Sequence, residues 1–285
     1  MEPSGSSPVP LDPLAARKAR FMGLDDQEIA ASFAVIESSF ERGRAMRGMV
    51  DHVPSEGIDP PQLSYAIAMT FRTGSTLLKD WLASTGVLGR PDEHLNRFFL
   101  DHWSAALRAD RLVPYLQATA RVHQTPNRVF GTKVEFRQFL PAILEDGLER
   151  AGIDPRWVYV ERHDLLGQAI SLAKAHVTQS WNSTEPPQSE PRFDEEAVVG
   201  ALKSITRQRQ LWERYFALIG VNPLRLTYED MIEDPTATVR AVAAHVGVEV
   251  ELLTEAPTSP MEIQRDAVND EWAQSVRARF SAVDL

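Results

Sequence analysis

Short apolar runs alternate along the chain with longer segments in which apolar residues recur at the spacing of one helix face. Four of these runs predict strands, at residues 65–70, 128–136, 157–160 and 224–228. Each run leads into a helix, and this alternation predicts an α/β fold with a central, mostly parallel sheet flanked by helices. Ligands of such sheets bind at the carboxyl ends of the strands, so we expect functional residues to follow the predicted strands.

The remaining patterns predict how the chain is divided. Further helices are predicted at residues 15–47, 98–121, 194–218 and 236–246. Residues 1–14 are rich in Pro, Ser and Gly and predict a disordered N-terminus, whereas residues 182–193 predict a mobile loop. We expect residues 15–285 to form a single domain, because their number suits one α/β unit.

The turn after the first predicted strand has the composition of an anion site. It contains Arg72, Thr73, Gly74, Ser75 and Thr76. The first N–H groups of a helix have no partner within the helix and lie at the positive end of its dipole. The glycine lets the backbone approach an anion, the hydroxyls add donors and the guanidinium adds permanent charge. The GxxxxGK[ST] loop of NTPases is absent, which favours one phosphate or a phosphosulfate. The alternative is a turn that only starts a helix.

Residues 71–78, Phe-Arg-Thr-Gly-Ser-Thr-Leu-Leu, resemble the 5′-phosphosulfate loop of sulfotransferases. The likeness is to the form of the bacterial trehalose 2-sulfotransferase-like family, whereas the more widespread form has Lys in place of Arg72. The resemblance covers about residues 64–280 and implies a P-loop-like sulfotransferase fold. It also implies 3′-phosphoadenosine-5′-phosphosulfate (PAPS) as the sulfonate donor, with Arg72 stabilising charge on the transferred group.

A second matching segment, Gly-x-x-Gly-x-Pro-x-Glu, begins at Gly86 and ends at Glu93. The resemblance implies that Glu93 is the general base that takes the proton of an acceptor hydroxyl. The alternative is a solvated loop glutamate. If Glu93 is not the base, His94 and Glu135 are the next candidates.

Lys133 lies in a Gly-x-Lys segment that the same family has. The resemblance implies that Lys133 stabilises charge near the transferred sulfonate or holds substrate. Glu135, two residues further on, is assigned with it to the substrate site. A solvated lysine at the end of a strand is the alternative interpretation.

Arg162 and Ser171 follow the third predicted strand and resemble the 3′-phosphate motif of sulfotransferases. The resemblance implies that Arg162 pairs with the 3′-phosphate and that Ser171 donates to it. The alternatives are a surface ion pair and a small residue at a helix contact. Near the C-terminus, Gln264 and Arg265 resemble a cofactor-binding segment, although Ile263 replaces the basic residue that usually precedes the Gln.

Composition limits the partners and the compartment. The chain has 30 basic and 40 acidic residues, and the resulting net charge of −10 disfavours binding to nucleic acid and to anionic membranes. It has no cysteine, no apolar run of membrane-spanning length and no signal-peptide pattern, so we expect a cytoplasmic protein. No cluster has metal-ligand spacing, so no metal is expected. Whether the chain forms a homodimer is left open.

The hypothesis from these patterns is a sulfotransferase. It moves a sulfonate from PAPS to a hydroxyl of a carbohydrate or glycosylated small molecule. One alternative is a kinase-like phosphoryl transferase, which would need Mg²⁺ ligands and a P-loop lysine. The other is a catalytically inactive module that binds PAPS or its product adenosine 3′,5′-bisphosphate (PAP).

Overall fold

The structure, a computed structural model, describes residues 11–181, 186–249, 257–260 and 267–281. Its centre is a four-stranded parallel sheet in the order β2-β1-β3-β4. The strands are β1 (Leu63–Met69), β2 (Val129–Glu135), β3 (Pro155–Glu161) and β4 (Leu224–Thr227). Met69 at the end of β1 lies opposite Glu135 of β2 and Val160 of β3, so the carboxyl ends share one edge. The predicted parallel sheet is confirmed.

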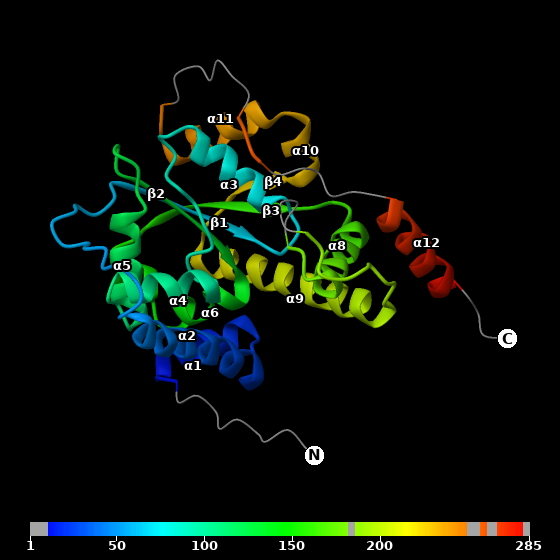
Figure 1. Ribbon diagram of the computed structural model, residues 1–285, viewed down its shortest axis with the longest axis horizontal. Helices are drawn as coiled ribbons and strands as arrows, with labels where there is room; N and C mark the ends of the chain where they lie inside the picture. Colours follow the sequence, from blue (N-terminus) through cyan, green and yellow to red (C-terminus); the bar gives the residue numbers. More distant parts are fainter. Residues whose placement is uncertain (1–10, 182–185, 250–256, 261–266, 282–285) are drawn as a thin grey trace.

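Helices cover both faces of this sheet. They are α1 (Pro13–Met22), α2 (Asp26–Met46), α3 (Ser75–Ser84), α4 (Arg97–Ala106), α5 (Leu112–Val122), α6 (Phe136–Leu144), α7 (Gly147–Arg150), α8 (Leu165–Thr178), α9 (Glu195–Ile219), α10 (Tyr228–Glu233), α11 (Pro235–Val246) and α12 (Ala267–Ser281). Helices α3, α10 and α11 lie on one face, and α1, α2, α4, α6 and α9 lie on the other (Figure 1). This is the layered arrangement that the alternating pattern predicts.

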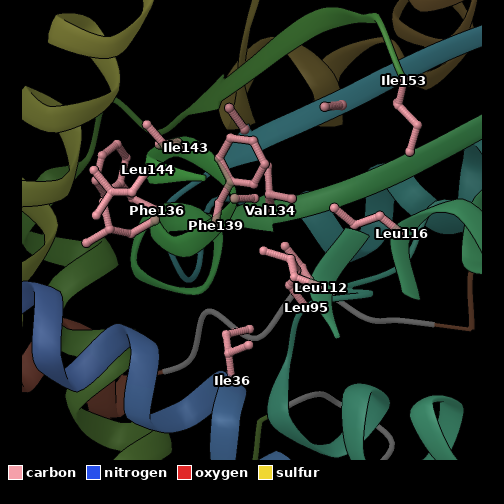
Figure 2. Packing of buried hydrophobic residues seen from close by; sticks show 14 of the residues in the cluster. Ile36, Leu95, Leu112, Leu116, Val134, Phe136, Phe139, Ile143, Leu144 and Ile153 are labelled. Carbon is pink, nitrogen blue, oxygen red and sulfur yellow. The ribbon is translucent and has the colours of Figure 1, made fainter. Parts of the chain in front are cut away.

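Two apolar cores lie on opposite faces of the sheet, because successive strand residues point to opposite sides. On β1, Tyr65, Ile67 and Met69 pack towards α3 and α11, whereas Ala66 and Ala68 pack towards α6 and α9. Figure 2 shows part of the second core, with Val134 of β2 among the α6 side chains Phe136, Phe139, Ile143 and Leu144. Together the two cores hold the carboxyl edge of the sheet in place between the layers.

The helical stretch predicted over residues 15–47 consists of two helices, and the second begins at the helix start predicted at Asp25 and Asp26. Gly23, in the left-handed conformation (φ 64°), ends α1, and Asp25 starts α2 with a capping box to Glu28. Pro13 and Leu14, which composition assigns to a disordered N-terminus, already belong to α1. Residues 1–10 lie outside the described residues.

Two helices begin directly where strands end, which shortens the predicted strands. Phe136 starts α6 because the side chain of Glu135 accepts a hydrogen bond from the N–H of Gln138. Tyr228 likewise starts α10, which Thr227 caps. Of the predicted loop 182–193, residues 182–185 lie outside the described residues. Among the described helices, none combines the length and the apolar character needed to cross a membrane.

Candidate active site

The loop between β1 and α3 leaves the amino end of α3 open. Its N-cap Gly74 has φ 78°, and no side chain of the described residues caps the helix. The first helical hydrogen bond runs from Leu78 N to Gly74 O at 3.1 Å. A Cβ on Gly74 would lie 2.5 Å from the ring of Tyr228, so glycine is required here. No capping side chain among the described residues therefore occupies the amino end of α3, where helices can bind anions.

Two arginines meet beside this loop. Arg72 donates from Nε to Ser171 Oγ at 2.8 Å, and Arg162 donates to the carbonyl of Arg72 at 3.5 Å. Burial and the charge of Arg162 lower the pKa of Arg72. The guanidinium of Arg162 lies 4.7 Å from the ring centroid of Tyr228 and 3.9 Å from the carboxylate of Asp164. Its buried Nε has no hydrogen-bond partner within the described ranges. An anion between the two guanidinium groups would relieve their repulsion.

The Tyr-Glu-Asp segment after β4 supports the Arg162 side of the site. The ring of Tyr228 packs against Arg162, and the carboxylate of Glu229 accepts the N–H groups of His163 (3.1 Å) and Asp164 (3.2 Å). These contacts fix the backbone that leads from β3 into α8. These contacts give the segment a structural role.

Gln168 of α8 joins the two predicted anion motifs. Its buried Nε2 donates to Thr70 Oγ1 at 2.8 Å and to Phe71 O at 2.7 Å, where β1 ends. Its Oε1 accepts a hydrogen bond from Arg209 of α9 at 3.1 Å. The amide nitrogen of Gln168 thus connects α8 to the end of β1, and its amide oxygen connects α8 to α9.

The loop that follows α3 lies along the edge strand β2. Lys133 N donates to Asp92 O at 2.8 Å, and Lys79 of α3 pairs with the Asp92 carboxylate at 3.0 Å. Gly89 has φ 73°, and a Cβ there would lie 2.8 Å from the backbone nitrogen of Gly131. Glycine at 89 therefore permits the close approach, which brings the predicted base to the carboxyl end of β2.

Glu93 lies in a chain of polar contacts that reaches the α3 loop. Its Oε1 lies 2.9 Å from Lys133 Nζ, and this Nζ lies 3.2 Å from Thr76 Oγ1. The other carboxylate oxygen, Oε2, accepts a hydrogen bond from Asn96 Nδ2 at 3.2 Å. The side chain of Lys133 is 3% exposed and that of Glu93 is 20% exposed. Neither is the solvated residue of the alternative interpretations.

Glu135 and His94 are more enclosed than Glu93. The carboxylate of Glu135 caps α6 and pairs with Arg137 at 3.2 Å, and burial raises its pKa. His94 is 1% exposed, and its Nδ1 lies 2.9 Å from Thr132 Oγ1. Burial lowers the pKa of His94 to about 3. Both side chains serve the packing of β2 in this structure.

A cavity of about 220 Å³ lies beside Arg162, between the start of α8 and helix α12. A larger cavity of about 910 Å³ lies away from the predicted site, where α1, α9 and the amino end of β3 meet. Gln264 and Arg265 lie outside the described residues. The structure thus brings together the α3 loop, Arg162, Ser171, Glu93 and Lys133 at one edge of the sheet.

The contact of Asn96 with Glu93 is absent from the sequence prediction. A signal was present, because Asn is a preferred N-cap residue and Asn96 directly precedes a helical pattern. Helix capping does not, however, reveal which carboxylate the remaining amide hydrogens meet. In the part of the chain that the structure describes, no group of three or more His, Asp or Glu side chains could hold a metal ion.

Comparison with known proteins decides the family. A family model described as Stf0 sulphotransferase matches residues 64–279. The chain belongs to the Stf0 sulphotransferase family. The match includes the sheet from Ser64 onwards, the β1–α3 loop, Glu93, Lys133 and the Arg162–Ser171 motif. The sulfotransferase family predicted from the loop sequence is therefore confirmed.

Curated relatives and one solved structure accompany this match. The trehalose 2-sulfotransferase of Mycobacterium tuberculosis (strain ATCC 35801 / TMC 107 / Erdman) is 29% identical over 261 residues, which cover 78% of this chain and 97% of the relative. That of Mycolicibacterium smegmatis (strain ATCC 700084 / mc(2)155) is 26% identical over 257 residues, which cover 75% and 94%. The sulfotransferase domain from the Synechococcus PCC 7002 olefin synthase has a TM-score of 0.41 at 15% identity, covering 81% of this chain and 92% of its own.

Proposed function

We propose that this Stf0 family member transfers a sulfonate from PAPS to a hydroxyl of a carbohydrate or a glycosylated small molecule. The observation that carries the proposal is the contact chain from Glu93 through Lys133 to Thr76. It joins a carboxylate suited to proton transfer to the loop that resembles a phosphosulfate site. The names of the two curated relatives, both trehalose 2-sulfotransferases, support a sugar as the acceptor.

The residues of the β1–α3 loop fit the 5′-phosphosulfate of PAPS. The amino end of α3 has no capping side chain among the described residues, and the backbone there is open because of Gly74. Arg72, Thr73, Gly74, Ser75 and Thr76 hold this group in our proposal. Arg162 and Ser171 bind the 3′-phosphate, which supplies the negative charge that two neighbouring guanidinium groups favour. Gln264 and Arg265 are further proposed contacts to the nucleotide.

Glu93 takes the proton from the acceptor hydroxyl while the hydroxyl oxygen attacks the sulfur of PAPS. The new bond joins that oxygen to sulfur, the bond from sulfur to the bridging phosphate oxygen breaks, and PAP leaves. Lys133 and Arg72 stabilise the negative charge that grows on the bridging and sulfonate oxygens. Their effect is greater in the transition state than in the ground state. Glu135, two residues beyond Lys133 on β2, is a further proposed contact to the substrate.

Transfer of radioactive sulfonate from labelled PAPS tests this function. The acceptor panel contains trehalose, other sugars and natural-product alcohols, and the assay runs with and without Mg²⁺. We expect labelled product from a sugar or glycoside without added metal. Phosphoryl transfer from ATP with Mg²⁺ would instead favour the kinase-like alternative. Tight PAP binding with no transfer to any acceptor would favour the inactive module.

A further inference from the structure

We infer that Asn96 is a positioning residue for Glu93, which it holds from the side opposite Lys133. The inference rests on the proposed role of Glu93 as the general base. Asn96 Nδ2 lies 3.2 Å from Glu93 Oε2, whereas Lys133 Nζ lies 2.9 Å from Glu93 Oε1. Each carboxylate oxygen therefore has its own donor, one from the start of α4 and one from β2.

The amide of Asn96 has two separate tasks. Its Oδ1 accepts a hydrogen bond from the N–H of Phe98 at 3.0 Å and thereby caps α4. Its Nδ2 is then directed back towards Glu93. The backbone closes the same turn, because Asn96 N donates to Glu93 O at 2.8 Å. Serine or aspartate could also cap the helix. The asparagine side chain, however, accepts a hydrogen bond at its amide oxygen and donates one from its amide nitrogen.

Helix α4 gives Asn96 a rigid support. Arg42 of α2 forms two contacts with the carboxylate of Asp101 of α4, at 2.7 and 3.0 Å. Gly43 of α2 lies so close to Ser104 of α4 that a Cβ on residue 43 would be 1.9 Å from Ser104 Oγ. The middle of α4 is thus fixed to α2, and this contact supports the helix that carries Asn96 at its N-cap.

The consequence concerns the orientation of the carboxylate. Two oxygens of a carboxylate offer about four acceptor positions, and Lys133 and Asn96 use one on each oxygen. The other positions stay available for an acceptor hydroxyl. Held at both oxygens, Glu93 has little rotational freedom, and a general base works best when its orientation is fixed before the reaction. Asn96 itself does not need to touch the substrate.

Asn96→Asp tests the inference with little change in shape. Aspartate caps a helix as well as asparagine does, so thermal stability and PAP affinity should stay as in the parent. The donor to Glu93, however, is replaced by a second negative charge. We expect kcat with PAPS and trehalose to fall roughly 10- to 100-fold with little change in KM. The acid limb of the pH–kcat profile should move to higher pH, because a like charge disfavours the ionised base.

Two further variants separate the causes. Asn96→Ser keeps a capping oxygen and replaces the amide donor with a shorter hydroxyl without adding charge, so kcat should fall by less than in Asn96→Asp. Asp234→Asn exchanges the same two residue types at the N-cap of α11 and should leave kcat unchanged. A ¹³C titration of the Glu93 carboxyl, assigned by its loss in Glu93→Gln, gives a readout that needs no acceptor. Its midpoint should rise in Asn96→Asp.

The outcomes distinguish this inference from the proposed function. If Glu93→Gln is inactive while Asn96→Asp keeps the parent kcat and titration midpoint, Asn96 does not position the base and the inference is wrong. A loss of melting temperature in Asn96→Asp with an unchanged midpoint would reveal a purely structural residue and would also overturn it. Near-normal turnover by Glu93→Gln would remove the proposed base, and the inference with it.

Discussion

Where β1 and β3 end, two guanidinium groups lie close to each other, whereas where β2 ends a carboxylate pairs directly with an ammonium group. According to their proposed roles, we call Arg72, Arg162 and Ser171 the nucleotide half of the site, and Glu93, Asn96 and Lys133 the base half. In the nucleotide half, the charge of Arg162 contributes to lowering the pKa of Arg72. In the base half, the Glu93 carboxylate has a donor on each oxygen. An anionic ligand would relieve the repulsion between the two guanidinium groups in the first half, whereas the second half is organised before a ligand binds. Binding and chemistry should then be separable by mutation.

Glu93→Gln should have the largest effect. It preserves shape and removes the base, so kcat should fall roughly 10²–10⁴-fold, the usual share of general-base catalysis. PAP affinity should hardly change, because Glu93 belongs to the base half. Steady-state kinetics and calorimetry measure the two quantities. Glu56→Gln, in an exposed turn, is the matched control. Retention of turnover by Glu93→Gln would contradict the division of the site into a nucleotide half and a base half.

Arg162→Ala should give the opposite pattern. A charged hydrogen bond to phosphate contributes roughly 1.5–3 kcal/mol, so PAP should bind roughly 10- to 150-fold more weakly. The kcat at saturating PAPS should change much less. Arg225→Ala serves as the control, because Arg225 pairs with Glu213 on the exposed side of β4. Unchanged affinity in Arg162→Ala, measured by calorimetry, would remove Arg162 from the nucleotide half.

Gly89→Ala should disturb the base half through the backbone. Alanine at φ 73° is strained, and its Cβ would lie 2.8 Å from Gly131 N. We expect a loss of roughly 1–3 kcal/mol in the free energy of unfolding, together with a fall in kcat at nearly constant PAP affinity. Gly57→Ala has a similar φ of 82° with nothing within 4 Å, so it should show the conformational cost alone. Equal stability losses in both variants, with parent kcat, would show that the loop tolerates displacement from β2.

The fold beside the base half should also respond to acid, through the buried His94. The pKa of the buried His94 is lowered to about 3, below the ordinary value of 6.5. Between these values the unfolded chain binds a proton that the folded chain does not, so stability is lost as pH falls from 6.5. One such histidine accounts for about 1–2 kcal/mol between pH 7 and pH 5. Urea unfolding of the parent and of His94→Gln measures this, and the variant should show a smaller pH dependence. Identical pH dependence would mean that His94 is not responsible.

Much of the fold could be predicted because its signals are local. The apolar runs mark the strands, and residues such as Asp25, Asp194 and Asp234 mark helix starts. The starts of α6 and α10 escaped prediction, because Glu135 and Thr227 cap these helices at the very ends of strands. The apolar pattern does not show that the last residue of a strand also serves as the N-cap of the next helix.

The site was predictable only as far as motifs extend. The loop at Gly74 and the motif at Arg162 have sequence signatures, and their approach follows from two parallel strands that lie side by side. The resemblance assigned roles to Glu93 and Lys133 separately, but their contact depends on a loop lying along β2 and was not predicted. Asn96 had no such signature, because the direction of one amide group is set by tertiary packing.

Calorimetric titration of the parent protein with PAP, without metal, tests most directly whether this edge of the sheet binds the nucleotide. The same preparation is titrated with ATP and Mg²⁺, and melting temperatures are recorded with each ligand. The two-arginine cluster predicts that PAP binds and raises the melting temperature without Mg²⁺, and that ATP with Mg²⁺ binds more weakly. Equal or tighter binding of ATP with Mg²⁺ would contradict the assignment and favour a phosphoryl transferase.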